Sequence, residues 1–244
     1  MSMAKAKKVV EEAGYTIKSL ADFGEMQFIT SGIEEIDAIT QFPRGRITEI
    51  SGMQGVGKSE LVQACLTNMS HAGKVLYIDA ENALNPARLI AKGGNANNIV
   101  VSDMCILEDV AKYTVDSVGK YDVIVVDSVA TLVPKSEAEG QTGDQFVGLK
   151  ARLMGQWMRK LIGPLGKSDC AIVFINQIRE SMSMYVPKFT PGGKALPYAA
   201  SLRLELSSNK ADRLADGSGH WVKVEVTKSR VCPPYQTTKF KLKY

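Results

Sequence analysis

The sequence predicts an α/β fold in which a mostly parallel central sheet has helices on both faces and antiparallel strands at its C-terminal end. From Phe28 onward, short apolar β-branched runs alternate with longer amphipathic stretches, the order of elements that builds a parallel sheet. The runs VIVV at 123–126 and AIVFI at 171–175 are almost continuously apolar, as expected for strands buried on both faces. After residue 200 the runs become short and alternating, with turn residues such as DGSG at 216–219 between them. These last strands are expected to extend the sheet in antiparallel or mixed fashion.

The same periodicities place the elements in order along the chain. Helices are expected at 58–71, 86–92, 107–118 and 144–165. Strands are expected at 46–50, 74–79, 99–102, 121–127, 171–176, 202–206, 221–226 and 237–242. Residues 3–13 predict a short helix ended by Gly14, followed by an extended stretch that cannot bury much by itself. We therefore expect an N-terminal arm at 1–27, either a frayed tail or an oligomerisation segment that packs on another surface, and one core at 28–244.

Length and composition are those of an ordinary globular protein. The chain has 244 residues, of which 45% are hydrophobic and 23% charged, enough for one large core or for one domain with a small appendage. It has no apolar run of about 18 residues and no secretory apolar segment, which argues against a membrane span and for the cytosol. Four dispersed cysteines and two histidines favour isolated thiols over a disulfide framework or a metal cluster.

The stretch ITEISGMQGVGKSELVQAC contains the most informative motif. Residues 52–59 fit G-x-x-x-x-G-K-[ST] between an apolar strand and an amphipathic helix, the context that a phosphate-binding loop requires. Glycines let consecutive N–H groups and the helix N-terminus face a phosphate, Lys58 adds a charge for the β- and γ-phosphates, and Ser59 offers a hydroxyl to Mg²⁺. The alternative, a Gly-rich turn with a lone exposed lysine, does not explain why strand, spacing and helix all agree. The motif predicts a nucleoside triphosphate site formed by Gly52, Met53, Gln54, Gly55, Val56, Gly57, Lys58 and Ser59.

Carboxylates and an amide follow three of the expected strands. Asp127 ends the strand YDVIVVD, where a carboxylate beside a phosphate loop can hold Mg²⁺ or its water shell; a helix N-cap is the alternative. Glu81 and Asp79 follow the strand VLYID, and Glu81 is the preferred general base because it lies past the strand end and is freer to reach a γ-phosphate. Gln177 follows the strand AIVFI and can hydrogen-bond that phosphate.

Two loops and a charge asymmetry indicate a polyanionic partner. Residues 1–144 contain 13 Lys and Arg against 20 Asp and Glu, whereas residues 145–244 contain 17 against 6. Nucleic acid is the commonest partner of such a basic half, although a solvated basic face gives the same pattern. The segment 180–191 mixes Met, aromatic and basic residues and is followed by GGK at 192–194, a composition suited to single-stranded nucleic acid. The acidic segment 136–148 is expected only to be a mobile loop.

Taken together, these residues resemble the bacterial and phage branch of the RecA family of homologous-recombination ATPases. The resemblance runs from Phe28 to Tyr244 through ordered blocks: ITSGIEEIDAI, YIDAENALNP, VIVVDSVATLVPKSEAEG, FINQIR and PGGKALPYAASLRLEL. It implies a P-loop NTPase core of RecA type, ATP and Mg²⁺ as cofactors, and a bacterial or phage-infected cytoplasm. It also implies a DNA-dependent ATPase that forms a helical filament on single-stranded DNA and pairs it with double-stranded DNA.

The resemblance assigns roles residue by residue. Glu81 becomes the catalytic base, Gln177 the switch between nucleotide and DNA loop, and Lys228 and Arg230 the cations that reach the γ-phosphate of a neighbouring subunit. The nucleotide site includes Lys58, Glu60, Asn85, Arg88 and Asp127, with Ser59 and Asp127 for the metal ion. The implied DNA contacts are Arg152, Arg159, Arg179, Gly192, Gly193 and Lys194.

Some positions depart from the family pattern. Asn85 replaces an aspartate and Arg88 a tyrosine on the adenine side, Arg230 stands where a lysine is usual, and Pro197 replaces an interface lysine. The chain stops at Tyr244, where cellular members continue into a second domain, so we expect either a minimal phage-type member or a truncated chain. Two alternative functions remain: a RecA-core ring motor of the helicase kind, and a mediator that loads or caps a recombinase filament without turnover.

Overall fold

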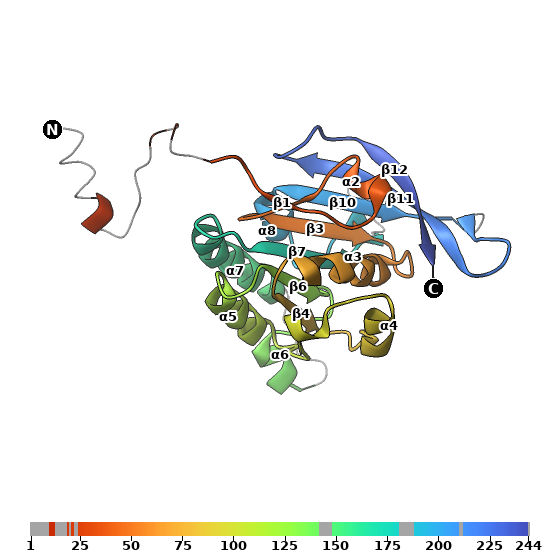
Figure 1. Ribbon diagram of the computed structural model, residues 1–244. Helices are drawn as coiled ribbons and strands as arrows, with labels where there is room; N and C mark the ends of the chain where they lie inside the picture. The colour runs from red at the N-terminus through yellow and green to blue at the C-terminus, as the bar shows by residue number, and fades with distance from the viewer. Residues whose placement is uncertain are drawn as a thin grey trace.

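One eight-stranded sheet organises the molecule (Figure 1), in the order β12-β11-β10-β3-β7-β6-β4-β5. The computed structural model describes residues 10–12, 19, 21, 24–141, 148–180, 188–209 and 212–243. Strands β10, β3, β7, β6, β4 and β5 are parallel to their neighbours, and β11 and β12 add antiparallel pairs at one end. The α/β fold with a mostly parallel sheet and antiparallel C-terminal strands is therefore confirmed.

The elements have the following bounds. The sheet consists of β3 (Ile47–Gly52), β4 (Val75–Asp79), β5 (Ile99–Ser102), β6 (Val123–Asp127), β7 (Ala171–Gln177), β10 (Leu202–Ser207), β11 (Gly219–Ser229) and β12 (Thr237–Lys243). The helices are α2 (Glu34–Asp37), α3 (Lys58–Ala72), α4 (Pro86–Ala91), α5 (Leu107–Ser117), α6 (Lys135–Glu139), α7 (Leu149–Leu165) and α8 (Ala195–Ala199), with a 3₁₀ turn, η2, at Ala96–Asn98. Two small antiparallel pairs join β1 (Phe28–Ile29) to β2 (Phe42–Pro43) and β8 (Arg179–Glu180) to β9 (Lys188–Phe189).

Most differences from the expected elements concern their ends. The helix expected at 144–165 begins at Leu149, because Gly148 before it has a left-handed backbone with φ of 73°, and residues 142–147 lie outside the described residues. Strand β11 is longer than expected because it pairs on one side with β10 and on the other with β12. Most of the expected helix at 3–13 also lies outside the described residues, of which 10–12 are helical.

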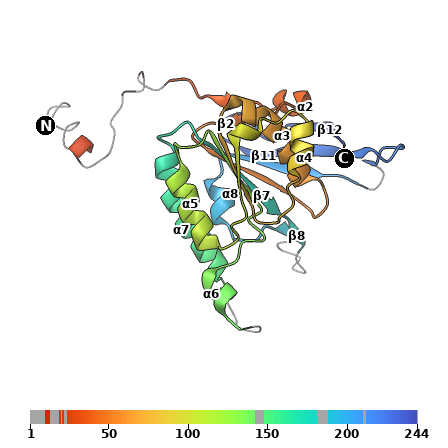
Figure 2. The ribbon, with the colours of Figure 1, turned by 60° about the horizontal axis from the view of Figure 1, so that its bottom comes forward.

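Helices cover the sheet on both faces (Figures 1 and 2), with α3 and α4 on one and α5, α7 and α8 on the other. Because side chains alternate along a strand, each buried strand contributes to two cores. Val123 and Val125 of β6 pack in the core that contains α3, whereas Ile124 and Val126 pack with α5 and α7. This two-sided burial explains why the strands read as continuous apolar runs.

The strand register brings the expected site residues to one edge. Gly52 at the end of β3 pairs with Gln177 at the end of β7, and Asp79 at the end of β4 pairs with Asp127 at the end of β6. Since β7 and β6 are adjacent, these four strand ends form a continuous row. The carboxyl edge of a parallel sheet is where α/β proteins place ligands.

Candidate functional site

The phosphate loop joins β3 to α3 and has the backbone that its glycines allow. Gly55 and Gly57 have positive φ values of 74° and 91°. A Cβ at Gly57 would come within 2.3 Å of the Leu242 side chain, so this position requires glycine both for its conformation and for space. Helix α3 begins at Lys58 and continues for 15 residues. Its N-terminus therefore presents free N–H groups and a partial positive charge at the loop.

The Lys58 side chain is held over the phosphate loop by a hydrogen bond to the loop backbone. Its side chain is largely buried, and Nζ donates a hydrogen bond to the Met53 carbonyl oxygen at 2.9 Å. Burial lowers the pKa of Lys58, whereas the nearby carboxylates of Glu81 and Asp127 raise it. The ammonium group thus lies between the loop and two acidic side chains, where it can bind a phosphate.

Asp127 provides the best-defined metal-ligand candidate. It is fully buried, and its Oδ2 accepts a hydrogen bond of 2.6 Å from the Tyr77 hydroxyl. Burial raises the pKa of Asp127 to about 6, although the Tyr77 and Ser59 hydroxyls near its carboxylate lower it. Its Oδ1 is also buried and has no hydrogen-bond partner of ordinary geometry in the described part of the chain; the Ser59 hydroxyl is near the carboxylate but does not meet that geometry.

A buried carboxylate oxygen without a partner fits Mg²⁺, which prefers oxygen ligands. Within the described ranges, no group of three or more His, Cys, Asp or Glu could hold a metal ion by itself. Ser59 and Asp127 would therefore have to share Mg²⁺ with the phosphates of a nucleotide, as Mg²⁺ sites in nucleotide-binding proteins generally do.

The two candidate bases have different surroundings. Asp79 accepts backbone hydrogen bonds from Ala83 at 3.0 Å and from Leu84 at 2.9 Å, so its carboxylate stabilises the turn after β4. Glu81 Oε1 instead accepts hydrogen bonds from the Ser128 hydroxyl and, at 3.4 Å, from the Gln177 amide. Only Glu81 faces the cavity at the strand ends, which has a volume of about 150 Å³. That cavity is lined by Gln54, Gly55, Gly57, Lys58, Ser59, Glu60, Glu81, Asp127, Ile175 and Gln177.

Gln177 is connected to a buried polar network that sequence reasoning missed. Its backbone N–H donates to Asn176 Oδ1 at 3.0 Å, and Asn176 Nδ2 donates to Glu49 Oε1 at 3.1 Å and to the Pro191 carbonyl at 3.3 Å. Glu49 is fully buried, and its Oε2 accepts from Arg203 Nε at 2.6 Å. The network therefore links the end of β7 to Pro191, near the end of the segment 180–194, which we call the second loop. A glutamate inside the apolar run ITEIS was the one sequence signal for it.

Asn85 and Arg88, which the family resemblance places on the adenine side, have mainly structural contacts in this structure. Asn85 caps α4 by accepting a hydrogen bond from the Arg88 backbone N–H at 3.0 Å. The Arg88 guanidinium donates to the Lys243 carbonyl at 3.0 Å and lies 3.8 Å from Glu60 of α3. Arg88 is thereby held beside the first turn of α3, between α4 and β12.

Several of the expected DNA contacts gather at the start of α7. Gly192 and Gly193 have positive φ, and a Cβ at Gly193 would meet the Ala151 side chain at 2.9 Å, so the end of the second loop packs on α7. Arg152 and Lys194 are both exposed. Arg179, also exposed, lies in β8 opposite Phe189. The loop segments 142–147 and 181–187 lie outside the described residues.

Lys150 belongs to the same region and was missed by sequence reasoning. Its Nζ donates to the Ala130 carbonyl at 2.8 Å. Burial lowers the pKa of Lys150 to about 8; Glu137 raises it and Arg179 lowers it. Partial burial of a lysine in the first turn of a helix leaves no recognisable sequence signal.

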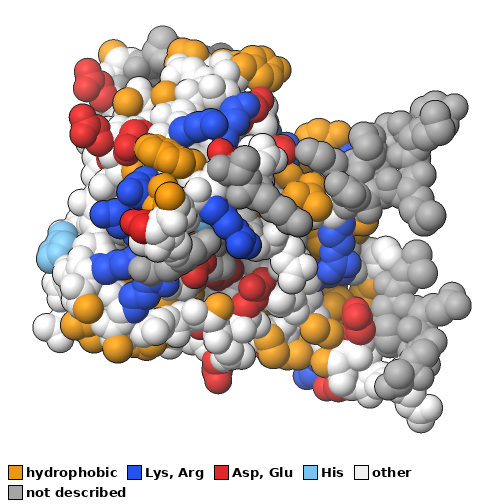
Figure 3. All heavy atoms as spheres, turned by 90° about the vertical axis from the view of Figure 1, so that its right-hand side faces the viewer, with side chains coloured by type: hydrophobic (Ala, Val, Ile, Leu, Met, Phe, Trp, Pro, Cys, Tyr) orange, Lys and Arg blue, Asp and Glu red, His pale blue; other side chains and the backbone are white. Residues whose placement is uncertain are grey.

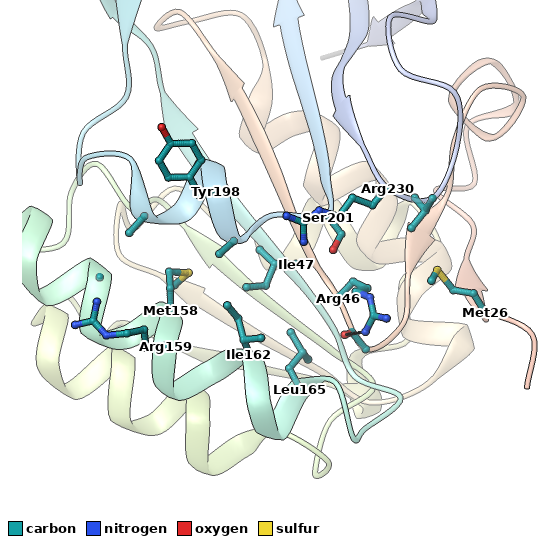
Figure 4. A pocket seen from close by; sticks show the side chains of 15 residues that line it. Met26, Arg46, Ile47, Met158, Arg159, Ile162, Leu165, Tyr198, Ser201 and Arg230 are labelled. Carbon is teal, nitrogen blue, oxygen red and sulfur yellow. Dashed lines mark hydrogen bonds between the residues drawn. The ribbon is translucent and has the colours of Figure 1, made fainter. Parts of the chain in front are cut away.

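Arg159 lies apart from this group, in a hollow of about 620 Å³ at the opposite edge of the sheet. Figure 4 shows Arg159 on α7, Tyr198 on α8, Arg46 before β3 and Arg230 after β11 around its rim. Apolar side chains such as Met158 and Ile162 of α7 contribute to its wall. The hollow is larger than the cavity at the phosphate loop, but it contains none of the strand-end carboxylates.

Lys228 and Arg230 are not brought to the phosphate loop within the chain. Lys228 Nζ donates to the carbonyls of Pro197 at 2.8 Å and Tyr198 at 2.9 Å, near the end of α8. The Arg230 N–H donates to the Ser201 carbonyl at 2.8 Å, before β10 begins. Burial lowers the pKa of Lys228, as do the neighbouring arginines at 230 and 203.

The face of the molecule at the end of β3 carries both signs of charge. Figure 3 shows Lys and Arg side chains distributed over this face with Asp and Glu side chains between them. It is therefore not a uniformly basic surface.

Among the helices of the described ranges, none is long and apolar enough to span a bilayer.

Comparison with known proteins identifies the family. The RecA N-terminal domain matches residues 13–244. The RecA protein of Clostridium acetobutylicum is 41% identical over 235 residues, covering 91% of this chain and 66% of that protein. Those of Symbiobacterium thermophilum (43% over 210 residues; 83% and 59%) and Levilactobacillus brevis (38% over 253 aligned residues; 98% and 66%) are similar. The chain spans slightly less than two thirds of the length of these relatives. With its phosphate loop, its sheet order and this match over nearly its full length, the chain belongs to the RecA family.

Proposed function

We propose that the chain is a DNA-dependent ATPase that assembles on single-stranded DNA as a helical filament and promotes homologous pairing and strand exchange with duplex DNA. The observation that supports this most is the meeting of Lys58, Glu81, Asp127 and Gln177 around one cavity at the carboxyl edge of the sheet. Gln177 is in turn joined by hydrogen bonds to the end of the segment expected to contact DNA. A nucleotide site and a DNA site would thus share one strand end.

Each side chain has a proposed part in ATP hydrolysis. The loop N–H groups and Lys58 bind the β- and γ-phosphates. Mg²⁺, held by Ser59 and Asp127, would neutralise phosphate charge when bound. Glu81 orients the attacking water and removes its proton, a role that requires a carboxylate within hydrogen-bond reach of that water. The Gln177 Nε2 atom lies 3.4 Å from Glu81 Oε1, on the same cavity. From this position the amide can donate a hydrogen bond to a γ-phosphate oxygen and respond when that phosphate leaves.

DNA binding is assigned to the start of α7 and the end of the second loop. Arg152, Arg179 and Lys194 offer positive charge, and Gly192 and Gly193 allow the backbone to approach closely. Contacts of this kind neutralise phosphates without reading base edges. Such binding tolerates any sequence and weakens steeply with salt, which suits a protein that must first bind a strand of arbitrary sequence.

Lys228 and Arg230 are proposed to act on the nucleotide of a neighbouring subunit. Among the described residues that line the cavity at the strand ends, Lys58 is present but no arginine, whereas phosphoryl transfer develops charge that a further cation stabilises. Their position at the opposite edge of the sheet supports a role across a subunit contact. Residues 1–27 are proposed to contribute to the same contact as an oligomerisation arm.

Electron microscopy with single-stranded DNA and a slowly hydrolysed ATP analogue tests the proposal. We expect helical filaments that require both nucleotide and DNA, together with DNA-stimulated ATPase activity in the absence of the analogue. Rings would instead favour a helicase-like motor, and neither assembly nor DNA-stimulated turnover would favour a mediator. The Lys58→Ala variant is the control, because loss of its phosphate contact should prevent nucleotide-dependent assembly.

A further inference from the structure

A tyrosine hydroxyl lies in the apolar core directly beside the proposed metal ligand. Tyr77 of β4 is completely buried among the side chains that pack against α3. A hydroxyl in such a place must find a partner, because leaving it without a hydrogen bond is costly. Its partner is Asp127, whose Oδ2 accepts the Tyr77 hydroxyl hydrogen at 2.6 Å. This short contact joins two residues separated by 50 positions in the sequence.

The strand register explains why the two side chains meet. Strands β4 and β6 are parallel neighbours, with Tyr77 opposite Val125 and Asp79 opposite Asp127. Tyr77 and Val125 belong to the same core, and Asp127 follows Val125 by two residues, so its side chain lies on the same face. Tyr77 therefore reaches Asp127 diagonally, a distance that aromatic side chains can span between adjacent strands.

The two carboxylate oxygens of Asp127 consequently have different surroundings. Oδ2 is engaged by Tyr77, whereas Oδ1 is buried and without a hydrogen-bond partner in the parts of the chain that are described. Asp127 lines the phosphate-loop cavity together with Ser59 and Lys58. The hydrogen bond to one oxygen fixes the rotation of the carboxylate, and the other oxygen is left for a ligand in the cavity.

We propose that Tyr77 is a positioning residue for Mg²⁺ binding, acting through Asp127. The inference rests on the proposed function, because it requires Mg²⁺ and nucleotide to bind at this site. Groups that hydrogen-bond a metal ligand orient it, and their loss typically weakens metal affinity about 10- to 100-fold. A phenylalanine at this position fills nearly the same volume, so packing alone does not require the hydroxyl.

The test is the Mg²⁺ dependence of nucleotide binding to the full chain. A fluorescent ATP analogue is titrated at increasing Mg²⁺ concentrations, and in EDTA, with the wild type, Tyr77→Phe and Tyr121→Phe. For Tyr77→Phe we expect the Mg²⁺ concentration at half-maximal binding to rise about 10-fold or more, with the same plateau at high Mg²⁺ and unchanged affinity in EDTA. Tyr121→Phe is the control, since it removes a tyrosine hydroxyl just before β6, at the opposite end of that strand from Asp127, and should leave the Mg²⁺ midpoint unchanged.

A double variant separates positioning from packing. In an Asp127→Asn background, Tyr77→Phe should have no further effect on the Mg²⁺ midpoint, because the hydroxyl acts through the carboxylate. An unchanged midpoint in Tyr77→Phe alone would overturn the inference, and so would an equal loss of affinity with and without Mg²⁺, which would mean a general loss of structure. If the wild type itself binds nucleotide independently of Mg²⁺, the proposed function fails and this inference with it.

Discussion

Mixing two inactive variants tests whether Lys228 and Arg230 complete the nucleotide site of a neighbour. In one chain the Arg230 N–H bonds to Ser201, whereas the phosphate loop follows Gly52, which pairs with Leu206. The five residue steps from Ser201 to Leu206 correspond to about 17 Å along the strands, and two strand spacings add about 10 Å sideways. The two groups are therefore too far apart for an arginine side chain to reach the loop of its own chain.

The expected rates follow from this geometry. Glu81→Gln lacks the base, Lys228→Ala/Arg230→Ala lacks the cations, and loss of a cation acting in trans costs about 10³-fold or more. In a polymer with a head-to-tail contact, each nucleotide site would take Glu81 from one subunit and the two cations from the next subunit. A mixed site is therefore active when a Lys228→Ala/Arg230→Ala subunit provides Glu81 and a neighbouring Glu81→Gln subunit provides Lys228 and Arg230. Random co-assembly of equal amounts therefore restores about one quarter of the wild-type sites, and the activity falls again when either variant is in excess.

The assay is phosphate release with single-stranded DNA at constant total protein, with co-assembly verified by energy transfer between labelled subunits. The control replaces the Glu81→Gln partner by one that also lacks Lys228 and Arg230, which should restore nothing. A rate that stays near zero at every ratio, despite co-assembly, would refute a trans role. Recovery in the control would mean that the regained activity does not depend on Lys228 and Arg230.

Further predictions concern the base, the buried ion pair and DNA binding. Glu81→Gln should lower the DNA-stimulated turnover about 10²- to 10⁴-fold while ATP binding stays intact; turnover at the wild-type rate would reject Glu81 as the base. Arg203→Met leaves the buried Glu49 carboxylate unpaired and should lower the free energy of unfolding in urea by about 3 kcal/mol, and a change near zero would contradict this. Lys150 lies near the proposed DNA contact Arg179 and is charged below its pKa of about 8. We therefore expect it to strengthen DNA binding at lower pH and to lose this effect as the pH rises through that value, and Lys150→Met should abolish this part of the pH dependence at constant ionic strength. Lys194→Ala should reduce the slope of log affinity against log salt by about one for all DNA sequences, and a sequence-specific loss would argue against a phosphate contact.

The fold and the central residues of the site could be predicted from local patterns in the sequence. Continuous apolar strands alternating with amphipathic stretches require a sheet covered on both faces, and the phosphate loop marks the edge at which its strands end. Once those strands are parallel, Asp127, Glu81 and Gln177 must approach one another, because each follows a strand that ends at that edge. The preference for Glu81 over Asp79 also has a structural counterpart, since Asp79 is bound to the backbone of its turn.

What the sequence could not provide depends on register and burial. Whether Tyr77 meets Asp127 is decided by which residues of β4 and β6 stand opposite each other, and a shift of one residue would move Tyr77 to the other face. The pairing of Glu49 with Arg203 likewise requires β10 to lie beside β3, although 154 positions separate the two residues. The lowered pKa of Lys150 arises from its surroundings and not from its neighbours in the sequence.

The residues proposed to form one nucleotide site lie at opposite edges of the sheet, and this constrains how subunits could assemble to bring them together. Glu81 and Lys58 lie at the carboxyl edge of the sheet, whereas Arg230 lies in the hollow at the other edge. A contact that brings Arg230 to a neighbour's γ-phosphate must therefore join unlike surfaces, and repetition of such a contact produces a ring if it closes and a helix if it does not. Each helix subunit would present the start of α7 at a fixed repeat, so that many weak phosphate contacts act together on one strand. Stable DNA binding would then require assembly, and because the cations arrive only with the neighbour, ATP turnover would require it as well.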